Sequence, residues 1–355
     1  MTQNQYLGAD LAPLLAAPDA AAFNTALVGA LEQVAANDLE ERAKALAAEI
    51  GKREPHVVGL QEVWYFFCVD LAEAPVPVGE GCANPRIAGA FEDHLVKTLV
   101  ALGAQGTSYQ PAASVTNLNL PGIPFQIDGY PALLVAFDRD VILARDDIIG
   151  AVQPVDFGCD GYVSADGCNY ATVLSADTPF GPVNVERGFV GVDVTLDGWT
   201  YRVVNTHLEV FEPAPGNPLS RAIQAQQSAE LLQTLAYAPP TADSLIVLGD
   251  FNSSPEHTPF GPIIPPYQQF VGSGFSDVWT LREDTDPGYT CCQDADLRNR
   301  RSLLGERIDL IFSWDLPSLV RKAHVLGGNA GDKTPPPGQG IWPSDHGSVV
   351  AELQY

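Results

Sequence analysis

The chain has 355 residues, of which 46% are hydrophobic and 18% charged, a composition typical of a globular protein with a sizeable core. It contains no run of about 18 apolar residues, which excludes a transmembrane helix. The 44 acidic and 19 basic residues give a formal net charge of −25, so few cations remain to contact the phosphates of a nucleic acid duplex. Duplex DNA is therefore not an expected partner, and we interpret the arginines near residue 300 as ordinary surface residues: Arg298, Arg300, Arg301 and Arg307.

The first predicted elements are an extended segment at Thr2 to Tyr6 and a helical region. Between Phe23 and Ile50, apolar residues recur at helical spacing, with one slipped step near Asn37 and Asp38. The slip predicts two helices, or one jogged helix, and Asp38 is the candidate cap.

A buried strand is predicted at Val57 to Val63, and it places Glu62 near its end. Four aromatic residues follow, Trp64 to Phe67. Because side chains alternate along a strand, only two of the four can face the core. The others are exposed, pack under the 68–82 loop or line a substrate cleft, and we expect an apolar substrate part only in the last case.

From Trp64 to Asp160 the sequence predicts irregular stretches rich in proline and glycine. A short helix around Phe91 to Leu102 and a strand at Ala132 to Phe137 interrupt them. The alternation then becomes clearer: Phe189 to Leu196 is a strand, and Asp197-Gly198 is a hairpin turn. The remaining elements are strands at Thr200 to Asn205, Ser244 to Gly249, Arg307 to Phe312 and Ser348 to Leu353, and a helix from about Leu219 to Ala236. Interleaved strands and helices without a linker predict one layered α/β or α+β domain, residues 1–355.

The six cysteines include two closely spaced pairs, Cys68 with Cys82 and Cys159 with Cys168. The loops between them favour two local disulfides, which in turn favour a secreted or periplasmic protein. Cys291 and Cys292 are adjacent, and a disulfide between neighbours is rare, so their state stays open. No signal peptide precedes Tyr6, so we expect that it has been removed or was never present.

Polar residues gather at the ends of the predicted strands. They are Glu62, His207, Asp250, Asn252, Asp345 and His346. In a sheet protein such positions converge on one face, where loops build sites. Carboxylates and a carboxamide without cysteine indicate a hard cation such as Mg²⁺, which Mn²⁺ or Ca²⁺ could replace. Each residue also has a purely structural explanation; Asp250 and Asn252, for example, suit an ordinary turn.

The motifs around these residues resemble the endonuclease/exonuclease/phosphatase superfamily, which has the DNase I-like fold. They are Gly59 to Val63, Asn205 to Leu208, Gly249 to Asn252, Arg307 to Asp309 and Ser344 to His346. The resemblance implies an α/β four-layer sandwich, in which two mixed β-sheets pack face to face and helices cover their outer faces. It also implies metal-dependent hydrolysis of a phosphate ester.

The resemblance further implies a role for each residue. Glu62 is the principal metal ligand, Asp345 completes the metal side, and Asn4 is a further ligand of the metal or of the phosphate. Asp250 orients or deprotonates the attacking water, and Asn252 holds that water and a phosphate oxygen. His207 stabilises the pentavalent phosphorane, His346 contacts the phosphate, and Asp309 orients His346.

The substrate is less well defined. The stretch from Gln61 to Trp64 is similar to neutral sphingomyelinases of the superfamily. We therefore expect a secreted phosphodiesterase, a monomer in transient contact with lipid surfaces, that attacks a phospholipid headgroup or a small organic phosphodiester. An extracellular nuclease for single-stranded or small nucleotide substrates is the alternative. A catalytically silent binding protein on the same fold is a third hypothesis.

Overall fold

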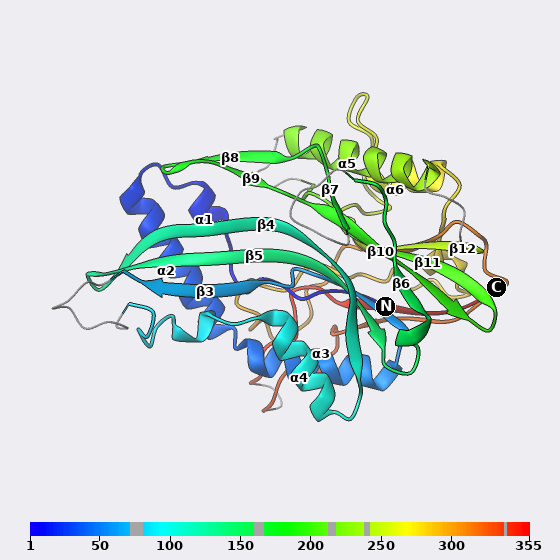
Figure 1. Cartoon of the computed structure of the whole chain (residues 1–355), viewed down its shortest axis with the longest axis horizontal. Helices are drawn as coiled ribbons and strands as arrows, with labels where there is room; N and C mark the ends of the chain where they lie inside the picture. The colour runs from blue at the N-terminus through cyan, green and yellow to red at the C-terminus, as the bar shows by residue number, and fades with distance from the viewer. Residues whose placement is uncertain (72–80, 160–166, 212–217, 238–241, 337–338) are drawn as a thin grey trace.

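The structure is a computed structural model that describes residues 1–71, 81–159, 167–211, 218–237, 242–336 and 339–355. It contains two seven-stranded sheets and a separate two-stranded ribbon (Figure 1). The first sheet has the order β15 (Leu319–Leu326), β16 (Ser348–Gln354), β1 (Thr2–Asn4), β2 (Val57–Gln61), β5 (Tyr130–Arg145) and β3 (Tyr65–Asp70), and β4 (Tyr109–Ile127) also pairs with β5. The second has the order β13 (Ser276–Asp277), β14 (Asp309–Ser313), β12 (Ser244–Asp250), β11 (Trp199–His207), β10 (Gly188–Leu196) and β6 (Val152–Pro154), and β7 (Gly167–Asn169) also pairs with β10.

Both sheets are mixed, because one pair in each runs parallel. These are β1 with β2 and β11 with β12. The sheets pack face to face through aliphatic side chains such as Val190 and Val192 from one and Ile142 and Val349 from the other. The ribbon is formed by β8 (Leu174–Thr178) and β9 (Gly181–Val185).

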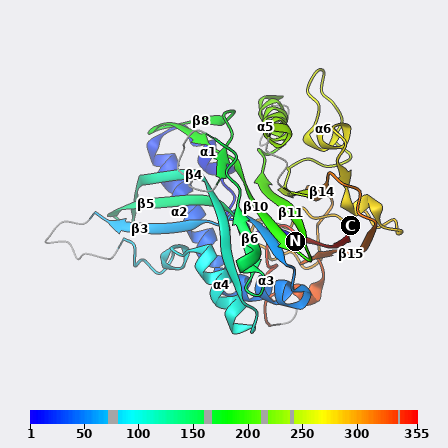
Figure 2. The ribbon, with the colours of Figure 1, turned by 45° about the vertical axis from the view of Figure 1, so that its right-hand side comes forward.

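Helices cover the outer faces of both sheets, as Figures 1 and 2 show. On the first sheet, α3 and α4 pack through residues such as Ile50 and Leu102, while α2 packs on the β3–β5–β4 part. On the second sheet, α5 and α6 pack through Leu231 and Phe270. The helices are α1 (Ala12–Leu15), α2 (Ala20–Ala36), α3 (Leu39–Arg53), α4 (His94–Ala104), α5 (Pro218–Tyr237) and α6 (Pro266–Gly272), with short 3₁₀ turns at Ala88–Ala90, Ile149–Ala151, Val278–Leu281 and Ala330–Asp332. The predicted four-layer sandwich of two mixed sheets is confirmed.

The slipped helical pattern divides into α2 and α3 as predicted. Asp38 caps α3, because its side chain accepts a hydrogen bond from the backbone N–H of Glu41. Because of the slip, the apolar faces of the two helices pack on different parts of the first sheet. Helix α2 buries residues such as Leu27 and Leu31 beside β4, and α3 buries Ala43 and Ile50 beside β2.

The region from Trp64 to Asp160 was wrongly predicted as largely irregular. Its second half contains the long β4–β5 hairpin, which is flanked by β3. Three register shifts along β4 accommodate Pro111 and the stretch around Gly122, since a bulge tolerates residues that would break a central strand. Buried and more exposed side chains still alternate along part of β4, where Ala113, Val115 and Asn117 are buried.

Two of the four aromatic residues after Glu62 belong to the core. Trp64 and Phe66 are each 6% exposed and stack on one another beside α2, whereas Phe67 on the other face of β3 is 48% exposed. Tyr65 stacks on Phe137 of β5. Trp64 and Phe66 therefore give no support to an apolar substrate cleft.

Disulfides join Cys68 to Cys82 and Cys159 to Cys168, as predicted from their spacing. Cys291 and Cys292 are also joined, which settles the pairing that the sequence left open. The 68–82 loop includes residues outside the described part of the chain. Among the helices that the structure describes, α5 included, none has the length and apolar character needed to cross a membrane.

The arginines near residue 300 do not form one surface group. Arg307 is buried, and its Nη2 lies 2.7 Å from Oδ2 of Asp277. The interpretation as ordinary surface residues is therefore wrong for Arg307, while Arg298 and Arg301 are exposed.

Candidate active site

The strand ends that carry the predicted site residues meet at one end of the sandwich. Asn4 ends β1 and is level with Gln61 of β2, directly before Glu62. In the second sheet His207 and Asp250 are paired residues at the ends of β11 and β12. Asp250 is also paired with Asp309 at the start of β14. Within each sheet the register thus brings the polar side chains to one edge, and the two edges meet where Asn4 contacts Asp250.

Asn4 connects the carboxylates of the two sheets. Its Nδ2 lies 3.1 Å from Oε1 of Glu62 and 3.0 Å from Oδ2 of Asp250. Its Oδ1 accepts a hydrogen bond from the backbone N–H of Tyr6 at 2.8 Å. Asn4 therefore holds two acids in place through its nitrogen and does not present its oxygen to a cation between them.

Two residues of the site have left-handed backbone conformations, Glu62 with φ +54° and Asn252 with φ +47°. This region is unfavourable for a glutamate, and strain of this kind concentrates at functional positions. The carboxylate of Glu62 is fixed in this conformation, because its Oε2 also accepts the backbone N–H of Leu7 at 2.7 Å.

Asp250 and Asn252 form a turn and still face the same site. The backbone N–H of Asn252 donates to Oδ1 of Asp250 at 2.9 Å, which is the local bond of an Asx-type turn. The turn points Nδ2 of Asn252 to within 3.2 Å of Nε2 of His207, while Oδ2 of Asp250 is 3.6 Å from the same nitrogen. The turn therefore does not prevent the two side chains from facing the same imidazole.

Gly249 is required by the close approach of β11 and β12. A Cβ atom built there would lie 1.9 Å from the carbonyl oxygen of Thr206, and φ is +149°. The glycine thus lets Asp250 come level with His207.

His346 is held by a carboxylate. Its Nδ1 lies 2.8 Å from Oδ2 of Asp309 and 3.8 Å from Oδ2 of Asp250. Thr290 supports this arrangement, because its Oγ1 accepts the backbone N–H groups of both Ile308 and Asp309 at 3.1 Å. Burial lowers the pKa of His346, but the carboxylates of Asp309, Asp345 and Asp250 outweigh it and hold the pKa well above its usual value.

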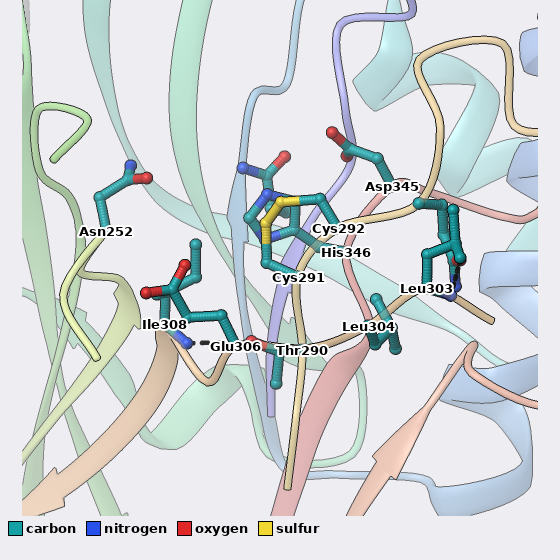
Figure 3. Close-up of a disulfide and its surroundings, with 12 residues drawn as sticks. Asn252, Thr290, Cys291, Cys292, Leu303, Leu304, Glu306, Ile308, Asp345 and His346 are labelled. Carbon is teal, nitrogen blue, oxygen red and sulfur yellow. Dashed lines mark hydrogen bonds between the residues drawn. A yellow bond between two sulfur atoms is a disulfide. The ribbon is translucent and has the colours of Figure 1, made fainter. Parts of the chain in front are cut away.

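The disulfide of Cys291 and Cys292 lies beside His346 (Figure 3). Backbone hydrogen bonds fix this segment between two others: Cys291 N–H donates to the oxygen of Glu306 at 2.9 Å, and Gly347 N–H donates to that of Thr290 at 2.7 Å. Figure 3 also shows the side chain of Glu306 between Asn252 and the disulfide. The disulfide and Glu306 are therefore part of the rim around the site.

The Ser344 hydroxyl connects Asp345 to Asn4. The Ser344 hydroxyl donates to the backbone oxygen of Asn4 at 2.8 Å and lies 3.4 Å from Oδ1 of Asp345. Burial raises the pKa of Asp345 to about 6; Glu62 also raises it, while His346 and Arg42 lower it. Asp345 is thus on the Glu62 side of the site.

Burial and the neighbouring Asp309 raise the pKa of Asp250 to about 7. Asp250, Asp309 and His346 have ligand atoms within 4.8 Å of one another. Together with Glu62 and Asp345 they form an oxygen-rich cluster with more acids than cations. This donor set suits a hard divalent cation, and it contains no thiolate, since both nearby cysteines are in a disulfide.

The sequence interpretation missed two arginines beside the site, the buried Arg42 and the partly buried Arg187. Arg42 of α3 is 1% exposed and donates to the backbone oxygens of Pro343 and Tyr6, at 2.9 and 3.0 Å, and to that of Gln5. Arg187 lies directly before β10, with Nη1 2.9 Å from Nδ1 of His207. A signal existed for Arg42, which falls on the apolar face of its helix three residues after Leu39. Arg187 has a weaker one, as a cation at the start of a buried strand.

A family model described as the Endonuclease/Exonuclease/phosphatase family matches residues 21–346. This chain belongs to that family. The family consists of metal-dependent hydrolases of phosphate esters, so the assignment as a phosphoester hydrolase agrees with the acidic cluster of the site. No curated protein matches the sequence.

Solved structures of endonuclease/exonuclease/phosphatase proteins share the fold. A mannosyl-6-phosphatase from Bacteroides thetaiotaomicron is 16% identical with a TM-score of 0.51, over 100% of this chain and 98% of that one. A second family protein from the same organism is 17% identical with a TM-score of 0.51, over 99% and 95%. A family protein from Leptotrichia buccalis has a TM-score of 0.48 at 15% identity, over 89% and 93%. At these identities the likeness concerns the fold alone.

Proposed function

We propose that this protein is a magnesium-dependent phosphodiesterase that acts on a phospholipid headgroup or a small organic phosphodiester. The observation that carries the proposal is the Asn4 bridge. It joins Glu62, the expected metal ligand, to Asp250, the expected base, at 3.1 and 3.0 Å. One hydrogen-bonded group thus provides both a place for a cation and a group that can take a proton from water.

In this proposal Glu62 and Asp345 hold Mg²⁺ and Asn4 keeps Glu62 in place. When bound, the cation neutralises phosphate charge and assists departure of the leaving oxygen. Asp250 orients a water molecule and takes one of its protons as the oxygen attacks phosphorus. The new P–O bond forms in line with the ester bond that breaks, and the leaving alkoxide takes up a proton from solvent water.

The histidines and Asn252 stabilise the transition state from the other side. His346, protonated and held by Asp309 at 2.8 Å, places positive charge beside the phosphoryl group. Asn252 and His207 lie 3.2 Å apart and can contact the same phosphoryl oxygen.

Charge supports a small substrate over a long nucleic acid. The chain carries a net charge of −25, and the half-exposed carboxylate of Glu306, whose Oε1 lies 2.5 Å from Nε2 of His257, is on the rim near Asn252 (Figure 3). A polyanion would be repelled by the net charge of the whole chain and by the carboxylate of Glu306. The disulfides agree with export, which gives access to extracellular phosphodiesters.

The test is a substrate panel in Mg²⁺, Ca²⁺ or EDTA. It includes sphingomyelin, phosphatidylcholine, bis-p-nitrophenyl phosphate, single-stranded and plasmid DNA, and mannose 6-phosphate. We expect metal-dependent turnover of the chromogenic diester and of at least one phospholipid. Faster turnover of the DNA substrates would favour the nuclease, faster turnover of the monoester a phosphatase, and no turnover in any assay a silent binding protein.

A further inference from the structure

Arg187 lies behind His207 and has no part in the reaction described above. Gly188 pairs with His207 across the β10–β11 ladder, so the residue before it reaches the imidazole. Nη1 of Arg187 is 2.9 Å from Nδ1 of His207, and the arginine side chain is only 12% exposed. This is a partly buried contact between a permanent cation and a candidate catalytic ring.

The contact determines which ring nitrogen of His207 carries the proton. A guanidinium has five N–H donors and no acceptor, so the hydrogen bond runs from Arg187 to Nδ1. Nδ1 therefore bears no proton, and the ring N–H is on Nε2. That nitrogen faces the site, at 3.6 Å from Oδ2 of Asp250 and 3.2 Å from Nδ2 of Asn252.

The neighbouring amide makes this assignment meaningful. One N–H of the Asn252 amide donates to the backbone oxygen of Leu208 at 3.0 Å. Its second N–H and the Nε2–H of His207 are both donors and cannot satisfy one another. An anionic oxygen between them would accept from both, which is the arrangement that stabilises charge developing on a phosphoryl group.

Two acids keep the guanidinium charged inside the protein. Oδ2 of Asp138 lies 3.7 Å from Nη1, and Oε1 of Glu209 lies 3.9 Å from Nη2. Both carboxylates are almost fully buried, and they come from β5 and from the segment after β11. Burial alone would lower the pKa of Arg187, but Glu209 and Asp138 outweigh it and raise the pKa. Arg187 therefore remains a donor at Nδ1.

The two histidines of the site thus have opposite partners. Nδ1 of His346 faces the acceptor Asp309 and keeps its proton, whereas Nδ1 of His207 faces the donor Arg187 and has none. Burial, Arg187 and His346 also lower the pKa of His207 well below its usual value. His346 is then the cationic ring and His207 the neutral one.

We propose that Arg187 is a positioning residue that locks His207 in the Nε2–H tautomer and aims this N–H at the phosphoryl oxygen of the substrate. The contact between this N–H and a phosphoryl oxygen rests on the proposed function. The tautomer rests on the contact alone, so it can be tested whether or not a substrate has been found.

The experiment compares Arg187→Gln with Arg187→Lys. Lysine is a donor only and should keep the tautomer, whereas glutamine can accept a hydrogen bond and should release it. The first readout is the ¹⁵N chemical shifts of the histidine rings in labelled protein, with His207→Gln used to assign the signals among the six histidines. We expect an unprotonated Nδ1 in the wild type and in Arg187→Lys, and a protonated or mixed Nδ1 in Arg187→Gln.

The second readout is hydrolysis of bis-p-nitrophenyl phosphate. We expect Arg187→Gln to lose about 100-fold in kcat with little change in KM, and Arg187→Lys to recover at least about tenfold of that loss. An Nδ1–H tautomer in the wild type overturns the proposal, and this result stands even if Arg187→Gln does not fold. An unchanged tautomer in a folded Arg187→Gln would also overturn the proposal. A changed tautomer with a normal kcat would overturn it as well. Absence of any turnover, with the expected spectra, would refute the proposed function and leave the tautomer assignment supported.

Discussion

Asp309 and His346 form a buried pair in which Oδ2 of the acid lies 2.8 Å from Nδ1 of the ring. The acid comes from the start of β14 and the histidine from the loop before β16, 37 residues apart. This pairing decides the charge of His346, because burial alone would favour the neutral ring.

Replacing Asp309 with asparagine should keep the hydrogen bond and remove the charge. We expect the pKa of His346 to fall and kcat on bis-p-nitrophenyl phosphate to drop about 100-fold, since the ring then loses its positive charge at neutral pH. The basic limb of the rate profile should move to lower pH. Asp193→Asn, which breaks a carboxylate pair with Arg202 at the far end of the β10–β11 ladder, is the matched control. Equal losses in both variants would contradict the assignment.

Glu62→Gln should abolish magnesium-stimulated hydrolysis. A glutamine preserves the acceptor for the backbone N–H of Leu7 but removes the charge that holds the cation. Loss of metal catalysis is expected to lower the rate about 1,000-fold. Glu49→Gln is the control, because Glu49 is a buried glutamate outside the site that accepts a hydrogen bond from Ser348 and lies on α3. Unchanged activity in Glu62→Gln, or an equal loss in Glu49→Gln, would refute the assignment.

Buried acids should make the metal-free protein less stable as the pH rises. Burial raises the pKa of Asp250 and Asp138 to about 7 and that of Glu49 to about 8. Below these values and above the unfolded values near 4, the folded protein binds more protons than the unfolded chain, so the free energy of unfolding falls with rising pH. The buried α-amino group of Met1 acts in the opposite sense, because burial lowers its pKa to about 5, but the raised pKa values of Asp140 and His346 add to the loss. We expect Tm in EDTA to fall by roughly 5 °C between pH 6.5 and 8.5.

Millimolar Mg²⁺ should reverse much of this loss. The ion binds the deprotonated carboxylates of the folded state, so its stabilising effect increases with pH. Differential scanning calorimetry should show a larger Mg²⁺-induced rise in Tm at pH 8.5 than at pH 6.5. Glu62→Gln should show little rise at either pH. A rise of the same size at both pH values would contradict the proposed site.

Gly249→Ala should destabilise the fold through a backbone contact and through a backbone conformation that disfavours a side chain. The added Cβ would meet the carbonyl oxygen of Thr206 at 1.9 Å, which forces β11 and β12 apart. We expect a loss of about 3 kcal/mol in urea denaturation. Gly103→Ala in α4 is the control: a Cβ there meets no atom within 4 Å among the described residues, so it should be neutral or stabilise by up to about 1 kcal/mol.

Thiol titration tests the cysteine pairing. The denatured, unreduced protein should contain fewer than one free thiol per chain, because all six cysteines are paired. After reduction the count should be six. Two free thiols would indicate that Cys291 and Cys292 are unpaired, and more than two would contradict the local disulfides expected of an exported protein.

The sequence by itself determined the fold class, the family and the residues at the strand ends. Apolar periods of 2.0 and 3.6 record which faces are buried, so strands such as Ser244 to Gly249 and the division of α2 from α3 at Asn37 and Asp38 could be predicted. The long β4–β5 hairpin could not, because prolines conceal a strand whose pairing depends on bulges.

Tertiary structure alone decided the contacts within the site. That Asn4 joins Glu62 to Asp250, or that Arg187 faces Nδ1 of His207, depends on distances between strands of different sheets, which no local pattern records. The same holds for the charges. Whether Asp250 is protonated or His346 cationic depends on burial and on neighbours up to hundreds of residues away in the chain. The residue types indicate the kind of reaction, and packing determines the protonation states and the geometry of the groups that carry it out.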